Sequence, residues 1–385
     1  MGLALQLAAK GRCRTHPNPM VGCVIVRDGQ VVGSGFHRKA GEPHAEALAL
    51  REAGERARGA TVYVTLEPCA HYGRTPPCAN ALVAAGVSRV VAAMVDPDPR
   101  VAGRGLERLR AAGISAEAGL MEAEARALNR AYLKLKATGR PLVILKWAMT
   151  LDGRIACASG HSRWVTGDAA RAHVHQIREQ VDAILVGSGT AAADDPELTA
   201  RPVQPGPLPG WMGTMESHAD AEPHWVPRDP LRVVLDSRAR LPLTARLLDP
   251  SLQKRPLPNR TLIATTPLAN PAKLAALQEA GAEVVLLPAE EGRVPLKPLL
   301  DELGRRGIGT LLVEGGAQVH WSFLSQGLAD YLMVYVAPKL VGGALAPGPV
   351  GGAGLLRMDD AWQVDELKVT PLGEDLLLEG YLLRR

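Results

Sequence analysis

Four side chains in the first third of the chain have the types and the spacing of a catalytic metal site. His44 and Glu46 lie two positions apart in "GEPHAEAL", and Cys69 and Cys78 follow in "EPCAHYGRTPPC". One imidazole and two thiolates are good zinc ligands, and three protein ligands leave the fourth tetrahedral position for water. Zinc lowers the pKa of such a water to about 7, and Glu46 is placed to move its proton. The four residues therefore predict a hydrolytic centre with one zinc ion per chain.

The pair His44 and Glu46 is weak by itself, because H-x-E on an alanine-rich helix is more often a surface or core pair. A free cysteine, likewise, is usually a small hydrophobic residue. The full order, H-x-E followed by P-C and a second cysteine, matches the signature of zinc-dependent deaminases. Here eight residues separate the two cysteines, whereas that signature has two, and His71 inside the insertion is a competing ligand. A structural zinc module is an alternative, and it would need a fourth protein ligand.

Length and composition restrict the classes of protein. A chain of 385 residues favours two domains. The net charge is only +4 and the basic residues are scattered, which argues against a nucleic-acid partner. Apolar runs fall short of the ~20 residues that span a bilayer, and the start of the chain is too short and too charged for a signal peptide. Five cysteines fit a reducing compartment better than a disulfide framework. We expect a cytoplasmic protein that binds neither nucleic acid nor membrane.

Alternating strands and helices must position the site residues of the first half. A hairpin turned by Asp28 and Gly29 precedes a helix over residues 44–54 and a buried strand over 60–68. Residues 122–139 have apolar spacing near 3.6 and predict one long amphipathic helix. Helices inserted between strands indicate an α/β sandwich around a partly parallel sheet.

A domain junction is predicted at "ATGRP", where Gly139 and Pro141 stop a helix. We therefore expect one domain over residues 1–140 and a second over 141–385, in which the alternation of strands and helices restarts. Residues 202–230 are rich in Pro, Gly and Trp without a period, and this pattern predicts an irregular surface excursion.

Two glycine motifs in the second half are candidates for a nucleotide site. "GSGTAA" after the strand "AILV" fits G-x-G-x-x-A, but Pro196 stops the following helix early and no acidic partner follows about twenty residues later. It is weak as a dinucleotide fingerprint. Gly315 and Gly316 connect a strand to a helix, where backbone N–H groups favour a phosphate. An ordinary strand-to-helix turn is the alternative for this pair.

Longer segments of the first half resemble one family, the bifunctional riboflavin-biosynthesis deaminase–reductases of the RibD/RibG type. The similar segments are "THPNPMVGCVIVRDGQVVGSGFH", "GEPHAE", "TLEPCAHYGRTPPC" and "DPDPRVAGRG". The resemblance implies a cytidine-deaminase-like three-layer α/β/α domain. It also implies contacts to the pyrimidine and its ribose phosphate from Asn18, His37, Arg74 and Thr75. Asp98 replaces an asparagine common in the family, and Asp96 is a weaker candidate.

The second half resembles the reductase part of the same family. The similar segments are "LKWAMTLDGRIA", "SRWVTG", "VGSGTAAADDPELTAR", "VVLDS", "LLVEGGAQVHWSFL" and "APKLVGG". The resemblance implies a dihydrofolate-reductase-like α/β domain that uses NADPH. The implied cofactor contacts are Ala148, Trp164, Thr190, Asp194, Ser237, Gly315, Gly316 and Ala317. The implied substrate contacts are Ser162, Arg178, Leu198, Arg201 and Glu314. Lys146 and Asp152 are possible site residues, although charges near strand ends are commonly structural, and Cys157 is expected to serve packing.

The reaction follows from the resemblance. It implies hydrolytic deamination of 2,5-diamino-6-(5-phosphoribosylamino)pyrimidin-4-one, followed by NADPH-dependent reduction of the ribosyl side chain to ribityl phosphate. The partners would be small phosphoribosyl pyrimidines and a second copy of the chain in a homodimer. One alternative is a nucleobase or tRNA deaminase whose C-terminal half only binds. Another is an enzyme in which one half is inactive.

Overall fold

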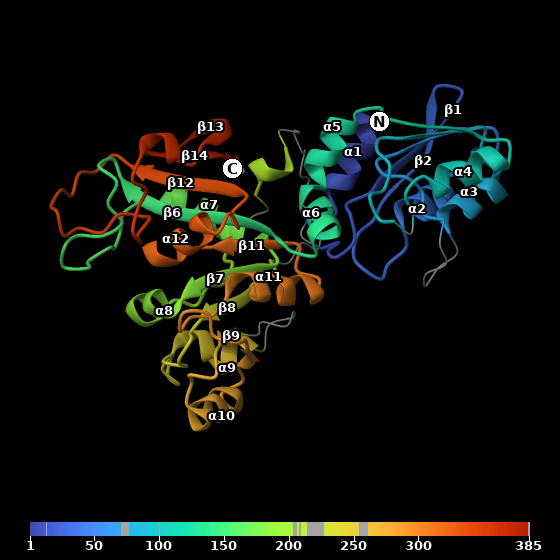
Figure 1. Ribbon diagram of the computed structural model, residues 1–385. Coiled ribbons are helices and arrows are strands. Elements are labelled where there is room, and N and C mark those ends of the chain that lie inside the picture. The colour runs from blue at the N-terminus through green and yellow to red at the C-terminus, as the bar shows by residue number, and fades with distance from the viewer. Residues whose placement is uncertain are drawn as a thin grey trace. The chain divides into compact units, whose positions relative to one another are not determined.

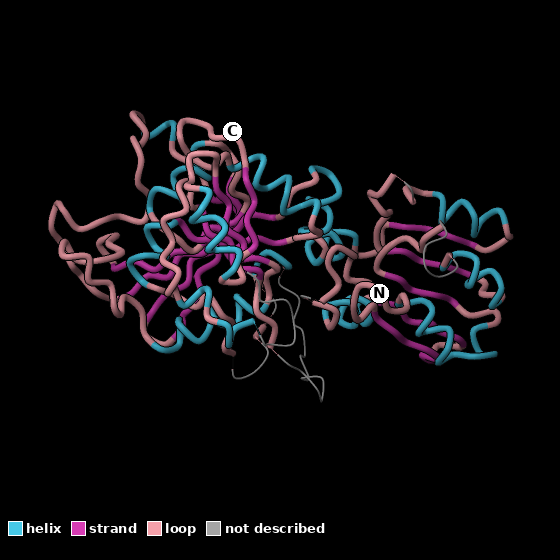
Figure 2. Tube along the Cα trace, turned by 90° about the horizontal axis from the view of Figure 1, so that it is seen from below, coloured by secondary structure: helices cyan, strands magenta, loops and turns pink. Residues whose placement is uncertain are grey.

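The computed structural model divides into two compact units, each built around its own β-sheet (Figures 1 and 2). It describes all residues except 13, 71–76, 100, 203–205, 208, 214–226, 254–260 and 384–385. The first unit comprises residues 1–139 and 207–222, and the second comprises 140–206 and 223–385.

The first unit has a five-stranded sheet in the order β2-β1-β3-β4-β5. β1 pairs antiparallel with β2 and β3, whereas β3, β4 and β5 are parallel, so the sheet is partly parallel as predicted. Asp28 and Gly29 both have positive φ, at 52° and 77°, as the predicted two-residue hairpin turn requires. The strands are β1 Gly22–Arg27, β2 Gln30–Phe36, β3 Thr61–Val64, β4 Arg89–Ala92 and β5 Ser115–Ala118.

Helices cover both faces of this sheet, which gives the expected three layers (Figure 1). Helices α2, α3 and α4 share one apolar core with Cys23 and Ile25 of β1, while α1 lies against Gly22 of that strand. The helices are α1 Gly2–Ala9, α2 Ala45–Ala53, α3 Cys78–Ala85, α4 Arg104–Ala111, α5 Glu122–Leu128 and α6 Arg130–Thr138, with the short 3-10 helix η1 Gly54–Ala57.

Two glycines of β2 bring α2 unusually close to the sheet. A Cβ atom at Gly33 would lie 2.3 Å from the carbonyl oxygen of Ala49, and one at Gly35 would lie 2.6 Å from that of Ala45. Any side chain at these positions would therefore push α2 outward. Since His44 immediately precedes α2, these two glycines help to fix the position of a predicted metal ligand.

The single amphipathic helix predicted over residues 122–139 is wrong. The chain forms α5 and α6 with a break at Asn129, whose side chain is buried. Its amide accepts a hydrogen bond from the backbone N–H of Met20 at 2.8 Å and donates one to the carbonyl of Met20 at 2.9 Å. An asparagine that pairs with the backbone of another segment favours a helix end over a helix interior.

The second unit has a nine-stranded sheet in the order β10-β9-β8-β7-β11-β6-β12-β14-β13. It is parallel from β10 to β12, and the last two strands form an antiparallel hairpin that the sequence did not indicate. The strands are β6 Leu142–Thr150, β7 Ala183–Gly187, β8 Leu231–Leu235, β9 Thr261–Thr265, β10 Glu283–Leu286, β11 Thr310–Val313, β12 Tyr331–Ala337, β13 Val364–Leu372 and β14 Asp375–Leu382.

The buried strands β7, β11 and β6 are neighbours and parallel, so their carboxyl ends meet at one edge of the sheet, where α/β folds usually bind ligands. None of the helices in the described part of the chain is both long and apolar enough to cross a membrane. The helices of this unit are α7 Asp168–Glu179, α8 Ser188–Asp194, α9 Pro250–Gln253, α10 Pro271–Glu279, α11 Leu296–Arg305 and α12 Ala317–Ser325, with the 3-10 helices η3 Arg246–Leu248 and η4 Met358–Asp360.

The prediction of an irregular surface excursion over residues 202–230 needs one correction. Within its described part, Gly210–Met212 forms a 3-10 helix, η2, in which Trp211 and Met212 are buried. This turn packs on α5, with Gly213 beside Ala127. Burial of a tryptophan accounts for this local order, since large aromatic side chains contribute much of the energy of packing.

Replacing Asn129 by Ala should destabilise the first unit. The substitution leaves both backbone groups of Met20 without the partners that the buried amide provides. The expected loss in the free energy of unfolding is about 2 to 4 kcal/mol, since each unpaired buried group costs about 1 to 3 kcal/mol. Urea denaturation followed by circular dichroism measures this loss.

Asn80→Ala is the matched control, because Asn80 lies on α3 of the same unit and its hydrogen bond to Arg108 is exposed. We expect a change below about 0.5 kcal/mol for this variant. Equal effects of the two substitutions would contradict a structural role for the Asn129 bridge.

Candidate active sites

Three predicted metal ligands converge at one end of the first sheet. His44 is the N-cap of α2, Cys78 is the first residue of α3, and Cys69 follows β3. The His44 Nδ1 atom lies 3.3 Å from the Cys78 sulfur and 3.7 Å from the Cys69 sulfur. All three ligand atoms lie within 4.8 Å of one another.

These spacings fit zinc. Tetrahedral zinc with bonds of about 2.0 to 2.3 Å holds its ligand atoms roughly 3.3 to 3.8 Å apart. Among the residues that the structure describes, no further His, Cys, Asp or Glu joins this group. His71, the competing ligand considered from the sequence, lies outside the described residues. Three ligands of this kind are typical of catalytic zinc.

The two helix starts favour a thiolate at this point. The Cys78 backbone N–H donates to the Cys69 sulfur at 3.3 Å, and both α2 and α3 begin at the site. A hydrogen bond from the Cys78 thiol lowers the pKa of Cys69 to about 4, against the opposing effect of burial, and His44 adds to this lowering. The same contact with Cys69, together with burial, raises the pKa of Cys78.

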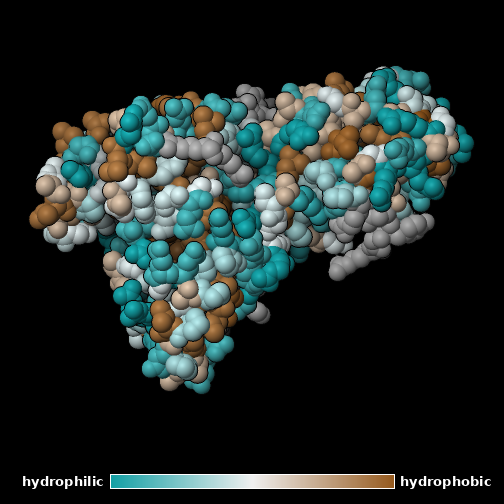
Figure 3. Space-filling view, in the orientation of Figure 1, coloured by the Kyte–Doolittle hydropathy of each residue, from teal (hydrophilic) through white to brown (hydrophobic). Residues whose placement is uncertain are grey.

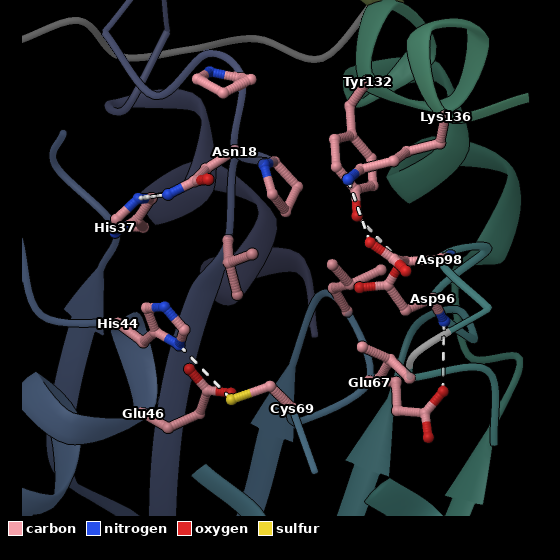
Figure 4. A pocket seen from close by; sticks show the side chains of 15 residues that line it. Asn18, His37, His44, Glu46, Glu67, Cys69, Asp96, Asp98, Tyr132 and Lys136 are labelled. Carbon is pink, nitrogen blue, oxygen red and sulfur yellow. Dashed lines mark hydrogen bonds and ion pairs between the residues drawn. The ribbon is translucent and has the colours of Figure 1, made fainter. Parts of the chain in front are cut away.

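Glu46 is buried on the first turn of α2, beside His44 and Cys69 (Figure 4). Burial raises the pKa of Glu46 to about 7, and the nearby His44 acts in the opposite direction. A carboxyl group with such a pKa accepts and returns a proton near neutral pH. Glu46 therefore lies where the sequence analysis placed the proton-transfer residue.

Asn18 and His37 form a hydrogen-bond chain that leads to the metal ligands. The Asn18 side-chain N–H donates to His37 Nε2 at 3.1 Å, and His37 Nδ1–H donates to the carbonyl of Pro43 at 3.2 Å. Burial lowers the pKa of His37, so its ring is neutral in this arrangement. Because Pro43 precedes His44, the chain also fixes the ligand. Arg74 and Thr75, the other predicted substrate contacts, lie outside the described residues.

The wall of the pocket across from the metal ligands comes from two loops and α6 (Figure 4). The Tyr132 hydroxyl donates to Asp96 at 2.9 Å, and the Lys136 ammonium group lies 3.0 Å from an Asp98 carboxylate oxygen. Sequence reasoning missed Tyr132 and Lys136, because the predicted amphipathic helix gave no reason to separate them from a solvated face. Glu67 also lines the pocket, and it accepts backbone hydrogen bonds at the start of α4.

A second cluster of charges lies at the carboxyl end of β11. Arg178 of α7 donates two hydrogen bonds of 2.8 Å to the Glu314 carboxylate, and Lys146 of β6 lies 3.7 Å from it. Burial opposes ionisation, yet the charges of Arg178 and Lys146 hold the pKa of Glu314 at about 2. The structure thus joins two predicted substrate residues, Arg178 and Glu314, with Lys146, which the sequence analysis gave as a possible site residue.

The loop after α8 brings further predicted residues to this cluster. Leu198 adopts a left-handed φ of 53°, and the next residue, Thr199, accepts hydrogen bonds at its carbonyl from Arg178 and His175. Arg201 lies 3.4 Å from His175 Nε2. His175 was missed, since the "HVH" run on α7 has no motif of its own. Burial and the charges of the two arginines lower its pKa to about 4.

Gly315, Gly316 and Thr190 form an open cradle at the same sheet edge. A Cβ at Gly315 would lie 2.9 Å from Val186 of β7, and one at Gly316 would lie 3.1 Å from the Thr190 hydroxyl. Gly316 has a φ of 77°, and α12 begins at Ala317 without a side-chain cap. Uncapped N–H groups at a helix start next to two glycines fit a phosphate of a dinucleotide.

The remaining predicted contacts of the second unit are less clearly gathered. Trp164 is exposed with Arg171 over its ring at 4.6 Å, and the Asp194 carbonyl accepts a hydrogen bond from Arg163. Ser237 accepts one from the Val294 backbone N–H. Ala148 lies on β6 opposite Tyr335, and Ser162 is half-buried in the loop before α7. Their roles stay predictions.

Comparisons with known proteins agree with both sites. Residues 141–378 match the RibD C-terminal domain, and residues 1–94 match the cytidine and deoxycytidylate deaminase zinc-binding region. Fold and sites thus define a two-domain enzyme with a zinc-binding deaminase half and a reductase half, and they confirm the expected fold class. Riboflavin biosynthesis protein RibD of Escherichia coli is 45% identical over 98% of this chain and 97% of its own.

Solved structures extend this likeness. Acinetobacter baumannii RibD is 42% identical with a TM-score of 0.83, covering 99% of this chain and 97% of its own. A Thermotoga maritima protein is 32% identical with a TM-score of 0.79 over the same shares. The chain belongs to the RibD family of riboflavin biosynthesis proteins. Its deaminase domain uses zinc and its reductase domain uses NADPH, as expected.

Replacing Cys69 by Ala should abolish tight zinc binding. The variant keeps two of the three converging ligand atoms, and the loss of a thiolate removes both a bond and a charge that a divalent ion needs. The purified protein should fall from about one zinc per chain to a trace, as measured by plasma mass spectrometry.

Cys157→Ala is the matched control, since this free and half-buried cysteine lies in the second unit. We expect its zinc content to equal that of the parent. A full zinc complement in Cys69→Ala would show that the metal is held elsewhere.

Replacing Gly316 by Ala should weaken NADPH binding. The residue has a φ of 77°, and the new Cβ would lie 3.1 Å from the Thr190 hydroxyl, so the cradle must shift. The KM for NADPH should rise about tenfold, which corresponds to the ~1 to 3 kcal/mol that such strain costs. Steady-state oxidation of NADPH at 340 nm measures it.

Gly327→Ala separates strain from binding. Gly327 follows the other end of α12 with a φ of 61°, and its added Cβ would meet no atom within 4 Å. It should lower stability without a change in the KM for NADPH. A similar KM increase in both variants would argue against a cofactor contact at Gly316.

Proposed function

We propose that the chain catalyses two consecutive steps on one phosphoribosylated pyrimidine. The first is hydrolytic deamination of 2,5-diamino-6-(5-phosphoribosylamino)pyrimidin-4-one, and the second is NADPH-dependent reduction of the ribosyl side chain to a ribityl chain. The Thermotoga maritima protein is described as a diaminohydroxyphosphoribosylaminopyrimidine deaminase and 5-amino-6-(5-phosphoribosylamino)uracil reductase. Its likeness over nearly the whole chain supports the same pair of substrates here.

The observation that carries the first step is the position of Glu46 next to three converging zinc ligands inside one pocket. Zinc held by His44, Cys69 and Cys78 supplies Lewis-acid activation of water. Glu46 takes the proton of the attacking water and returns it to the departing amine, for which a pKa of about 7 is suited. Asn18 and the neutral His37 line the same pocket and orient the pyrimidine ring.

The second step is assigned to the cluster around Glu314. NADPH supplies the hydride, and the cradle of Gly315 and Gly316 receives one of its phosphates. Arg178 and Arg201 are placed to bind the phosphate of the substrate, because both guanidinium groups lie by the loop around Thr199. Glu314 stays ionised and stabilises positive charge that develops at the C–N centre during reduction.

Domain limits, oligomeric state and location belong to the same proposal. We place the domains at residues 1–140 and 141–385, in line with the two compact units apart from Arg140 and residues 207–222. A homodimer through the second domain is supported by the apolar side chains of Leu367 and Val369, which are exposed on edge strand β13. Figure 3 also shows apolar residues gathered at its left end. Leu345 and Leu356 are further exposed apolar side chains of the second unit. Four free cysteines among the described residues support a reducing cytoplasm.

Replacing Glu46 by Gln should stop ammonia release while zinc stays bound. The amide keeps the volume of the carboxyl group but cannot move a proton, so the rate should fall at least about 100-fold. Ammonia is assayed after incubation of the purified chain with the diaminopyrimidine ribose phosphate, and NADPH oxidation is followed separately with the deaminated compound.

Glu52→Gln on the exposed face of α2 is the matched control and should release ammonia at the parent rate. Both variants should oxidise NADPH normally with the deaminated compound. Ammonia release by Glu46→Gln at the parent rate would refute the assignment of the proton carrier. Failure of the parent chain to oxidise NADPH would favour a deaminase whose second half only binds.

A further inference from the structure

Acidic side chains outnumber basic ones in the described lining of the deaminase pocket, although the proposed substrate carries a phosphate. Four carboxyl groups line it, from Glu46, Glu67, Asp96 and Asp98. Among the lining residues that the structure describes, Lys136 is the one lysine or arginine. Within this described lining, a phosphate group would meet four acidic side chains and a single ammonium group, while the predicted contact Arg74 lies outside the described residues.

Lys136 is held in place without being enclosed. Its ammonium group lies 3.0 Å from the carboxylate of buried Asp98 and 5.5 Å from the centre of the Tyr132 ring. The Lys136 side chain keeps 28% of its surface exposed, whereas that of Asp98 keeps 8%. An ammonium group has three N–H donors, and the contact with Asp98 uses one of them. Among the described residues, Asp98 is the one hydrogen-bond partner of this ammonium group, which leaves the other donors to a ligand in the pocket.

The position of Lys136 fits one end of the proposed substrate. Figure 4 shows Lys136, Tyr132 and Asp98 on the wall across from His44, Cys69 and Glu46. The carbon that loses its amine must lie at the metal ligands and Glu46. The ribosylamino group is attached at ring carbon C6, which one ring nitrogen separates from the reacting carbon C2. The phosphate lies at the far end of the ribose, several bonds from the reacting carbon, so it can reach the wall across from the metal ligands.

A purely structural role is the competing hypothesis, because the pair of Lys136 and Asp98 joins α6 to the loop after β4. This ion pair is partly buried, so it also neutralises the charge of Asp98, and its loss would by itself cost some stability. Burying Asp98 beside Asp96 is costly, and a lysine that only neutralised Asp98 would not need to face the pocket. Its exposure on the pocket side favours a contact with a ligand.

We propose that Lys136 is a substrate-binding residue of the deaminase domain, where its ammonium group contacts the phosphate of the phosphoribosyl pyrimidine. This inference rests on the proposed function, and it adds a cation to the pocket that no motif in the sequence marks. Lys136 should contribute to recognition of the phosphate and not to the chemistry at the ring carbon.

The test compares two substrates in ammonia release: the diaminopyrimidine ribose phosphate and the same compound without its phosphate. The ratio of their kcat/KM values measures how much the enzyme gains from the phosphate. Lys136→Met removes the charge but keeps the length of the side chain, and it should lower this ratio about tenfold or more, because a charge-assisted contact is lost. The change should appear in KM, with kcat little altered.

Two further variants separate binding from structure. Lys136→Arg keeps a positive charge at the site and should restore most of the ratio. Lys134→Met changes a lysine two positions earlier on α6 that does not line the pocket, and the ratio should match that of the parent. Zinc content and NADPH oxidation with the deaminated compound should equal parental values in all three variants, which shows that each chain is folded.

If Lys136→Met lowers kcat/KM by the same factor for both substrates, Lys136 only supports the pocket and the proposal is wrong. The proposal is also wrong if the substitution changes neither value. Failure of the proposed function would look different, because the parent chain itself would then release no ammonia from either substrate.

Discussion

The deaminase site depends on the start of α2 and the start of α3 meeting at the end of β3. His44 and Cys78 occupy these helix starts, and the backbone N–H of Cys78 at the start of α3 donates to the sulfur of Cys69. The partial positive charge of the helix starts favours thiolate over thiol, which is the form that binds a metal. Gly33 and Gly35 matter here because they let α2 lie directly on the sheet. Ligands that lie up to 34 positions apart in sequence are thereby held by backbone geometry more than by side-chain packing.

The reductase site uses the same principle with different chemistry. Glu314 and the glycine cradle also follow the carboxyl end of a parallel strand, β11, where the chain leaves the sheet and backbone groups become available, while Arg178 and His175 come from α7. The two sites differ in their charged residues, because the reductase site contains a buried cluster of ion pairs. Arg178 and Lys146 meet Glu314 in a buried group, and removal of Glu314 would leave two buried cations without their counter-ion. Such a cluster stays fixed before a substrate arrives, and preorganised charge is the main way an enzyme stabilises a transition state.

Local patterns predicted the zinc ligands and most strands, because these features depend on neighbours in sequence. His44, Glu46, Cys69 and Cys78 form a motif that is specific to one kind of metal site, and apolar runs mark buried strands whatever surrounds them. The break at Asn129 could not be predicted in this way, since it depends on the backbone of Met20, more than a hundred residues earlier. The β13–β14 hairpin was missed because β13 is largely exposed and lacks the apolar alternation of a half-buried strand.

The charge of the zinc ligands bears directly on how an anionic substrate enters the first site. Two thiolates from Cys69 and Cys78 balance the two charges of a zinc ion, so a centre of this composition has no net positive charge to offer a phosphate. The acidic groups Asp96 and Asp98 repel a phosphate. Attraction must then come from cations outside the metal centre. The resemblance implies Arg74 as one of them, and Lys136 on the far wall, paired with Asp98, is the one that the structure describes. Deamination thus takes place at the end of the pocket with the metal ligands, and the phosphate is recognised at the end with Lys136.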